Sequence, residues 1–275
     1  MLRALLGLLI PALLLGGTPR RVVSQTLGTD ELLLALADPS QIAALSHLAA
    51  DPKFSPVVKE AASYPRLRDS DAESVLKHRP DLVLVASYTR AETRALLQRS
   101  GVKVVAIERF DTFEELCANA KRVGVALGRR DRAEGLVAGW KARVAALQAR
   151  LAGAPPVRVI APSTYGFIAG LDTTFDDVCR HAGAVNVAAE AGLKGHAPTP
   201  SEALLGWKID VLVISDDERG DIAERLSGLP PYKFLEAFKG RRFARISGPA
   251  MSSISQARLE AYEQLAKALH PERFR

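Results

Sequence analysis

The stretch DAESVLKHRPDLVLVAS at residues 71–87 recurs in weakened form as PSEALLGWKIDVLVISD at residues 200–216. Each copy passes from a helical pattern into an unbroken apolar run, which is typical of a strand in a parallel sheet covered on both faces. An acid, a leucine and an aspartate match at one constant offset: Glu73 with Glu202, Leu76 with Leu205, and Asp81 with Asp210. The sequence therefore predicts an internal duplication of an α/β unit.

Further short strands are expected on either side of both copies. They lie at residues 21–23 and 102–107 in the first half and at residues 158–160 and 243–246 in the second. Strands that alternate with helical stretches predict parallel α/β lobes of Rossmann-like form, joined internally by right-handed crossovers. Because open α/β sheets bind ligands at the carboxyl ends of their strands, we expect a ligand cleft between the two lobes.

One long helix is predicted between the halves. From Asp131 to Leu151 apolar residues recur every three or four positions, and Gly153 to Pro156 then end the helix. About 22 residues would span roughly 33 Å, enough for a single stiff connection between the lobes. The predicted organisation is a signal peptide at 1–18, an N-terminal lobe at 19–128, the connecting helix at 129–153 and a C-terminal lobe at 154–275.

The N-terminus has the pattern of a secretory signal. A positive start at Met1 to Arg3 precedes an apolar run at residues 4–15, and small residues follow at Gly16 to Thr18. A short membrane anchor is the alternative reading of this run. No cysteine lies near its end, so we expect cleavage without lipid attachment and a protein free in the periplasm.

Composition excludes some partners and sites. The chain has 275 residues, with 37 Lys and Arg against 31 Asp and Glu, and these charges are scattered. No nucleic-acid motif accompanies the positive balance, so nucleic acid is not an expected partner. Cys117 and Cys179 lack metal-site spacing and are placed in different lobes, so we expect two buried, unpaired thiols and no protein-bound metal.

Three stretches together resemble a known family. They are RVVSQTLGTDELLLALA at 21–37, ESVLKHRPDLVLV at 73–85 and SQARLEAYEQLAKALHP at 255–271. In this order, around a long helix, they resemble the iron-chelate and cobalamin class of periplasmic binding proteins of ABC importers. The resemblance implies a monomer that carries a siderophore-bound iron or haem to an inner-membrane permease, without a cofactor of its own. Cobalamin is the alternative ligand.

The resemblance also implies two docking residues. In that family one glutamate on each lobe is thought to contact arginines of the permease, and Glu73 and Glu202 match these positions. Both also fit capping boxes, at Ser70 to Glu73 and at Thr199 to Glu202 with Pro200 as the first helical residue. A capping role and a docking role are compatible.

Ligand contacts are expected in the loops at the strand ends. The candidates are Tyr64, Arg68, Tyr88, Arg109, Tyr165, Phe167, His196 and Met251. As alternatives, Tyr88 and Phe167 would be core residues, Arg109 would pair with Glu108 or Asp111, and His196 would be exposed without a ligand.

The sequence also carries an expectation about the kind of chelate. Trp140 and Trp207 are not expected in the cleft, which weakens a corrinoid ligand. Arginines favour carboxylates of a siderophore or haem; the basic candidates for this role are Arg66, Arg68, Arg109 and His196.

Two other classes of function are compatible with two α/β lobes around a cleft. An enzyme is disfavoured because residues 24–30 read SQTLGTD, which is neither GxGxxG nor a P-loop, and because the five histidines are scattered. We therefore expect no catalytic residues. A ligand sensor on the same fold stays open, since sequence does not separate sensing from transport.

Overall fold

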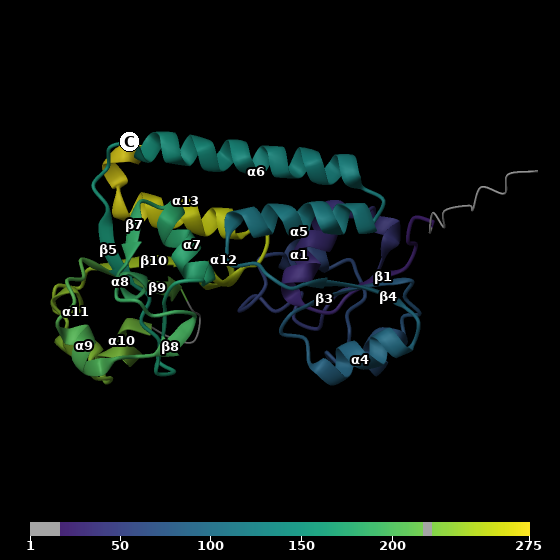
Figure 1. The fold of residues 1–275 in the computed structure, drawn as a ribbon, viewed down its shortest axis with the longest axis horizontal. Coiled ribbons are helices and arrows are strands. Elements are labelled where there is room, and N and C mark those ends of the chain that lie inside the picture. The colour runs from purple at the N-terminus through teal and green to yellow at the C-terminus, as the bar shows by residue number, and fades with distance from the viewer. Residues whose placement is uncertain (1–16, 217–221) are drawn as a thin grey trace, which may run out of the picture.

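The structure is a computed structural model that describes residues 17–216 and 222–275 (Figure 1). Almost all of the predicted signal peptide therefore lies outside the described residues. Within the described part, no helix is both long enough and apolar enough to cross a membrane.

The first lobe contains a four-stranded parallel sheet in the order β2-β1-β3-β4. Alternate side chains of the central strand β3 point to opposite faces, and all five of its residues are buried. Leu82 and Leu84 pack against α1 and α5, whereas Val83 and Val85 pack against α3 and α4. The strands are β1 (Val22–Ser24), β2 (Ile42–Ala44), β3 (Leu82–Ala86) and β4 (Lys103–Ile107).

The second lobe repeats this arrangement. Its parallel sheet has the order β10-β9-β5-β7, so β5, β9 and β10 correspond to β1, β3 and β4. The predicted duplication is confirmed at the level of strand order. The strands are β5 (Val157–Ile160), β7 (Ala184–Asn186), β9 (Val211–Asp216) and β10 (Phe243–Ser247). A two-stranded antiparallel sheet, β6 (Phe167–Ala169) and β8 (His196–Pro198), was not predicted.

Helices cover both faces of each sheet. In the first lobe they are α1 (Leu27–Leu36), α2 (Val58–Ala61), α3 (Ala72–Leu76), α4 (Ala91–Arg99) and α5 (Phe113–Ala126). In the second lobe they are α7 (Thr174–His181), α8 (Val187–Glu190), α9 (Ser201–Leu205), α10 (Ile222–Ser227), α11 (Glu236–Lys239), α12 (Gly248–Ser252) and α13 (Arg258–Leu269). Cys117 on α5 and Cys179 on α7 are buried and free, as expected.

The connecting helix α6 (Arg130–Leu151) has 22 residues and runs along both lobes, with α5 beneath one part and α13 beneath another (Figure 1). Its buried stripe follows the predicted spacing, and Trp140 lies in it. Close approach of α5 and α6 depends on Gly124, because a Cβ there would lie 2.3 Å from the Cβ of Ala133.

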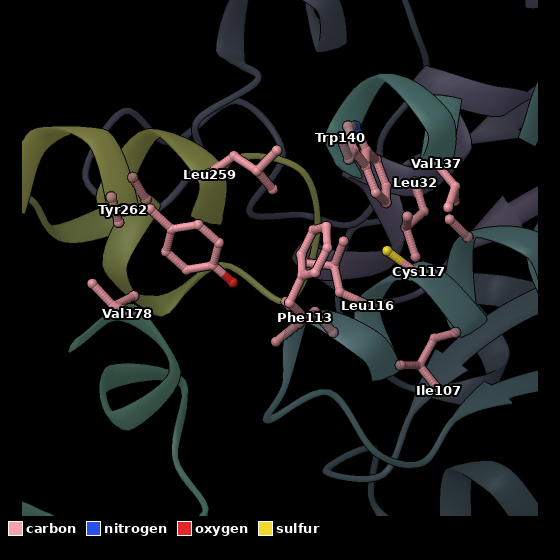
Figure 2. Close-up of a cluster of buried hydrophobic side chains, with 14 of the residues drawn as sticks. Leu32, Ile107, Phe113, Leu116, Cys117, Val137, Trp140, Val178, Leu259 and Tyr262 are labelled. Carbon is pink, nitrogen blue, oxygen red and sulfur yellow. The ribbon is translucent and has the colours of Figure 1, made fainter. Parts of the chain in front are cut away.

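Below α6, apolar side chains of both lobes form one continuous cluster. Figure 2 shows Phe113 and Leu116 of the first lobe close to Tyr262 of the second. The rings of Phe113 and Tyr262 meet edge to face with centroids 6.5 Å apart, and His181 stacks on Tyr262 at 4.5 Å. The lobes are therefore joined by shared packing as well as by α6.

A buried ion pair of the second lobe is hydrogen-bonded across the same boundary. Arg258 of α13 is fully buried and pairs with Asp177 of α7 at 3.2 Å. Its remaining donors reach the carbonyls of Ser253 at 2.8 Å and of Phe110, in the first lobe, at 2.6 Å. Asp177 also accepts from the backbone N–H of Phe113 at 3.1 Å and from the Tyr262 hydroxyl. The guanidinium of Arg258 and the carboxylate of Asp177 therefore both have hydrogen-bonding partners.

Replacing Arg258 by Met should lower the free energy of unfolding by about 3–5 kcal/mol, because it leaves Asp177 and two carbonyls buried without their donor. The matched control is Arg143→Met, which breaks the half-exposed pair with Glu263 and should cost less than about 1 kcal/mol. Urea denaturation of the three proteins measures both values. Equal losses for the two variants would contradict the structural role assigned to Arg258.

Candidate functional site

A cavity of about 800 Å³ lies between the lobes, where the strands of both sheets end. The first lobe contributes Tyr88, which follows β3, and Phe110 and Asp111, which follow β4. The second lobe contributes the turn after β5, the two-stranded sheet of β6 and β8, the start of α7 and the α12 region. Its place agrees with the position expected of a ligand site in open α/β sheets.

Aromatic rings form much of the cavity wall. Tyr88 and Phe110 meet edge to face at 5.9 Å, and Tyr165, Phe167 and Phe175 come from the second lobe. Tyr88 is 56% exposed, Tyr165 77% and Phe167 48%. Large rings left this open to solvent around a concave surface are typical of a ligand-binding site. The alternative that Tyr88 and Phe167 are core residues is wrong.

The structure brings together five of the eight ligand candidates predicted from the sequence. The residues that line the cavity are Tyr88, Tyr165, Phe167, His196 and Met251. Their contact with a ligand stays a prediction.

The other three candidates are not among the lining residues. Tyr64 packs partly buried against the core of the first lobe, and Arg68 is exposed. Arg109 is 80% exposed at its side chain and pairs with Glu115 at 2.5 Å. The alternative that Arg109 pairs with a nearby acid is confirmed, but the acid is Glu115 and neither Glu108 nor Asp111, since Glu108 pairs with Arg94.

Tyr88 is held at the cavity by its neighbour. The Thr89 hydroxyl accepts from the backbone N–H of Ala86 at 3.2 Å and donates to Gln25 at 2.7 Å. Gln25 in turn donates to the carbonyl of Ser70. This chain fixes the turn after β3, and Tyr88 also lines a smaller cavity of about 280 Å³ in the first lobe.

Sequence reasoning missed the two-stranded sheet of β6 and β8 that carries Phe167 and His196. In the antiparallel register Ala169 lies opposite His196 and Phe167 opposite Pro198, so one small sheet presents both side chains. Gly166 and Gly195 precede these strands at positive φ, which glycine adopts without strain. These glycines were the available signal. Three-residue strands were too short to show an alternating pattern.

The part of the cavity lining formed by Ser252 and Ile254, called the cavity floor, is bound to the first lobe through the buried carboxylate of Glu31. Ser252 and Ile254 line the cavity, while Ser253 and Ser255 both donate to Glu31 of α1. Gly28 permits this contact, because a Cβ there would lie 2.0 Å from a side-chain carbon of Ile254. The floor therefore depends on α1 of the opposite lobe.

Two adjacent carboxyls of α1 are affected by this burial. Burial raises the pKa of Glu31 to about 7, although the two serines and the positive charge of Arg258 oppose the rise. Burial likewise raises the pKa of Asp30 to about 7, against hydrogen bonds from Ser24 and Ser46. The folded protein consequently holds protons near neutral pH that the unfolded chain has released.

The sign of the pH dependence follows from these raised values. Between about pH 4.5 and 7 the folded state binds more protons at Asp30 and Glu31 than the unfolded state, so these groups stabilise the fold at low pH and the gain is lost as pH rises through 7. Melting temperatures should fall by several degrees from pH 5 to pH 7.5 through this contribution. Glu31→Gln should reduce the slope, whereas Glu92→Gln, at an exposed position of α4, should not. An unchanged slope in Glu31→Gln would contradict the assignment.

The two predicted docking residues are exposed, and neither caps its helix. The N-cap of α3 is Asp71, which accepts from the Ser74 N–H, so the capping box predicted at Ser70 to Glu73 is wrong. Glu73 instead pairs with Lys77 at 2.9 Å. Pro200 is itself the N-cap of α9, without a side-chain hydrogen bond, so the second predicted box is also wrong. Glu73 and Glu202 each lie at the second position of their helix. A carboxylate there interacts favourably with the helix dipole and stabilises the helix only modestly.

Comparison with known proteins places these features in context. A family model described as periplasmic binding protein matches residues 22–249. The uncharacterized ABC transporter substrate-binding lipoprotein YvrC of Bacillus subtilis (strain 168) is 21% identical over 266 residues, covering 94% of this chain and 82% of that protein.

Solved structures are similar over almost the whole chain. The apo form of the periplasmic heme-binding protein RhuT from Roseiflexus sp. RS-1 has a TM-score of 0.80 at 23% identity, covering 92% of this chain and 99% of that one. The periplasmic vitamin B12 binding protein BtuF of Vibrio cholerae has a TM-score of 0.73 at 16% identity, covering 94% and 99%. At these identities the likeness establishes the fold.

Proposed function

Since the chain belongs to the periplasmic binding protein family, we propose that it captures a metal chelate between its lobes and delivers it to the permease of an ABC importer. The observation that carries this proposal is the cavity of about 800 Å³ with exposed aromatic walls from both lobes. Its volume lies within the range of small-molecule sites, roughly 300–1,000 Å³.

The aromatic residues that line the cavity and the ligands named for two similar structures support a metal chelate as the ligand. Flat metal-centred rings offer large faces, and aromatic side chains bind such faces by stacking and edge contacts. RhuT is named for heme and BtuF for vitamin B12. An iron chelate, as siderophore or haem, is the ligand proposed from the sequence, with cobalamin as the alternative.

Location and partners are part of the same proposal. We place the mature protein in the periplasm as a monomer, after removal of residues 1–18. Its first cysteine is Cys117, so the proposal includes no lipid attachment, although the relative YvrC is named a lipoprotein. The relation to an ABC transporter component favours transport over sensing, and the family gives no reason to assign a catalytic step.

Native mass spectrometry with a ferric siderophore, haemin and cyanocobalamin tests the cavity. We expect one chelate of this panel to bind, and Tyr88→Ala with Phe167→Ala to weaken it by about tenfold or more, since each ring contributes about 0.5–1.5 kcal/mol beyond buried area. Phe234→Ala, at an exposed ring outside the cavity, is the control. Failure of the whole panel to bind, or equal binding by the double variant, would refute the proposal.

Docking is tested by charge reversal at Glu73 and Glu202. Figure 1 shows α9 on the side of its lobe away from α6, and α3 packs on α4, which lies on the corresponding side of the other lobe. The double variant Glu73→Arg with Glu202→Arg should abolish uptake in cells and leave ligand affinity unchanged. Glu92→Arg with Glu236→Arg reverses the same number of exposed charges and should preserve uptake. Normal uptake by the first variant would exclude these residues as the docking pair.

A further inference from the structure

Two carboxylates line the cavity without partners. Asp111 follows β4 in the first lobe, and Asp172 precedes α7 in the second. Within residues 17–216 and 222–275, neither side chain has a hydrogen bond or an ion pair. No Lys or Arg of these described ranges lines the cavity.

The nearest guanidinium groups are already engaged. Arg109 pairs with Glu115, and Arg258 is buried with Asp177 and two backbone carbonyls. Glu115 also accepts from the backbone N–H of Asp111. Burial first, and then the charges of Glu115 and Asp172, raise the pKa of Asp111, although Arg258 and Arg109 oppose the rise. Asp111 and Asp172 therefore line the same cavity from opposite lobes.

Asp172 stands immediately before Thr173, the N-cap of α7, which also lines the cavity. Its φ is +59°, a left-handed conformation that aspartate adopts more readily than most residues. The start of α7 therefore holds this carboxylate beside the cavity.

A ligand that fills the cavity removes water from both carboxylates. A desolvated charge without a partner is strongly unfavourable, and a ligand carboxylate placed beside it would add repulsion. A ligand N–H donor or a positive charge would instead replace the lost water. Charge-assisted hydrogen bonds of this type are roughly twice as strong as neutral ones.

We propose, resting on the proposed function, that Asp111 and Asp172 select a metal chelate that presents amide N–H donors or positive charge between the lobes, and discriminate against chelates edged with carboxylates. A corrinoid with peripheral amides belongs to the favoured class, and a haem with two propionates does not. This favours the alternative ligand, a corrinoid, over the haem proposed from the sequence. Of the basic candidates expected to hold ligand carboxylates, Arg66, Arg68 and Arg109 do not line the cavity, and His196 does.

The test compares ligands that differ only in edge chemistry. Isothermal titration would measure haemin, haemin with both propionates converted to primary amides, and cyanocobalamin as a second amide-bearing ring. We expect the diamide to bind at least about tenfold more tightly than haemin, a difference of about 1.4 kcal/mol. In Asp111→Asn with Asp172→Asn the two haemins should differ by less than about threefold. Glu92→Gln removes one exposed charge outside the cavity and should preserve the full difference.

The outcomes separate this inference from the proposed function. Equal or tighter binding of haemin by the native protein, or a preference unchanged in the double variant, would overturn the inference and leave chelate binding in place. If no haemin, cyanocobalamin or ferric siderophore binds, the proposed function falls, and the inference falls with it.

Discussion

The relative position of the lobes depends on one buried guanidinium. Arg258 joins Asp177, the carbonyl of Ser253 and, from the other lobe, the carbonyl of Phe110. The residue after Phe110 is Asp111, and the residue before Ser253 is Ser252, and both line the cavity. A single buried cation thus binds the backbone beside two lining residues of the site, one from each lobe, and adds to the packing that α6 shares with both lobes.

Contacts near this cation also fix the segment that carries the lining residues Ser252 and Ile254. Glu31 receives two serine hydroxyls from the segment that follows α12, and Gly28 lets Ile254 approach α1. Burying this carboxylate beside Asp30 is costly when both are ionised, and this explains the raised pKa values. The contacts that hold the site therefore lower the free energy of unfolding at neutral pH. Functional regions commonly carry such a cost.

The sequence predicted the elements with strong periodicity and missed those fixed by tertiary contacts. The strands at residues 82–86 and 211–216 and the helix at residues 130–151 were recognised because burial on both faces, or along one stripe, leaves a repeating apolar pattern. Strands β2, β7, β6 and β8 have three residues each, too few for such a pattern. Arg109 was misplaced because Glu115, in the capping box of α5, pairs with its side chain, and sequence gives no order of preference among nearby acids. The aromatic candidates Tyr88, Tyr165 and Phe167 do line the cavity. Their position follows from the chain direction, because parallel strands end at the same edge of a sheet.

The two lobes share one strand order, yet within the described chain only the second carries the two-stranded sheet of β6 and β8. Phe167 and His196 come from this sheet, which is separate from the four-stranded sheet of its lobe. Ile168 and Ala169 of β6 are buried in the core, whereas Phe167 and His196 are exposed. Substitutions confined to the two exposed positions would alter the surface presented to a ligand and leave the buried pair in place. The nutrient accepted by such a lobe could therefore change through side chains alone, without any change of strand order.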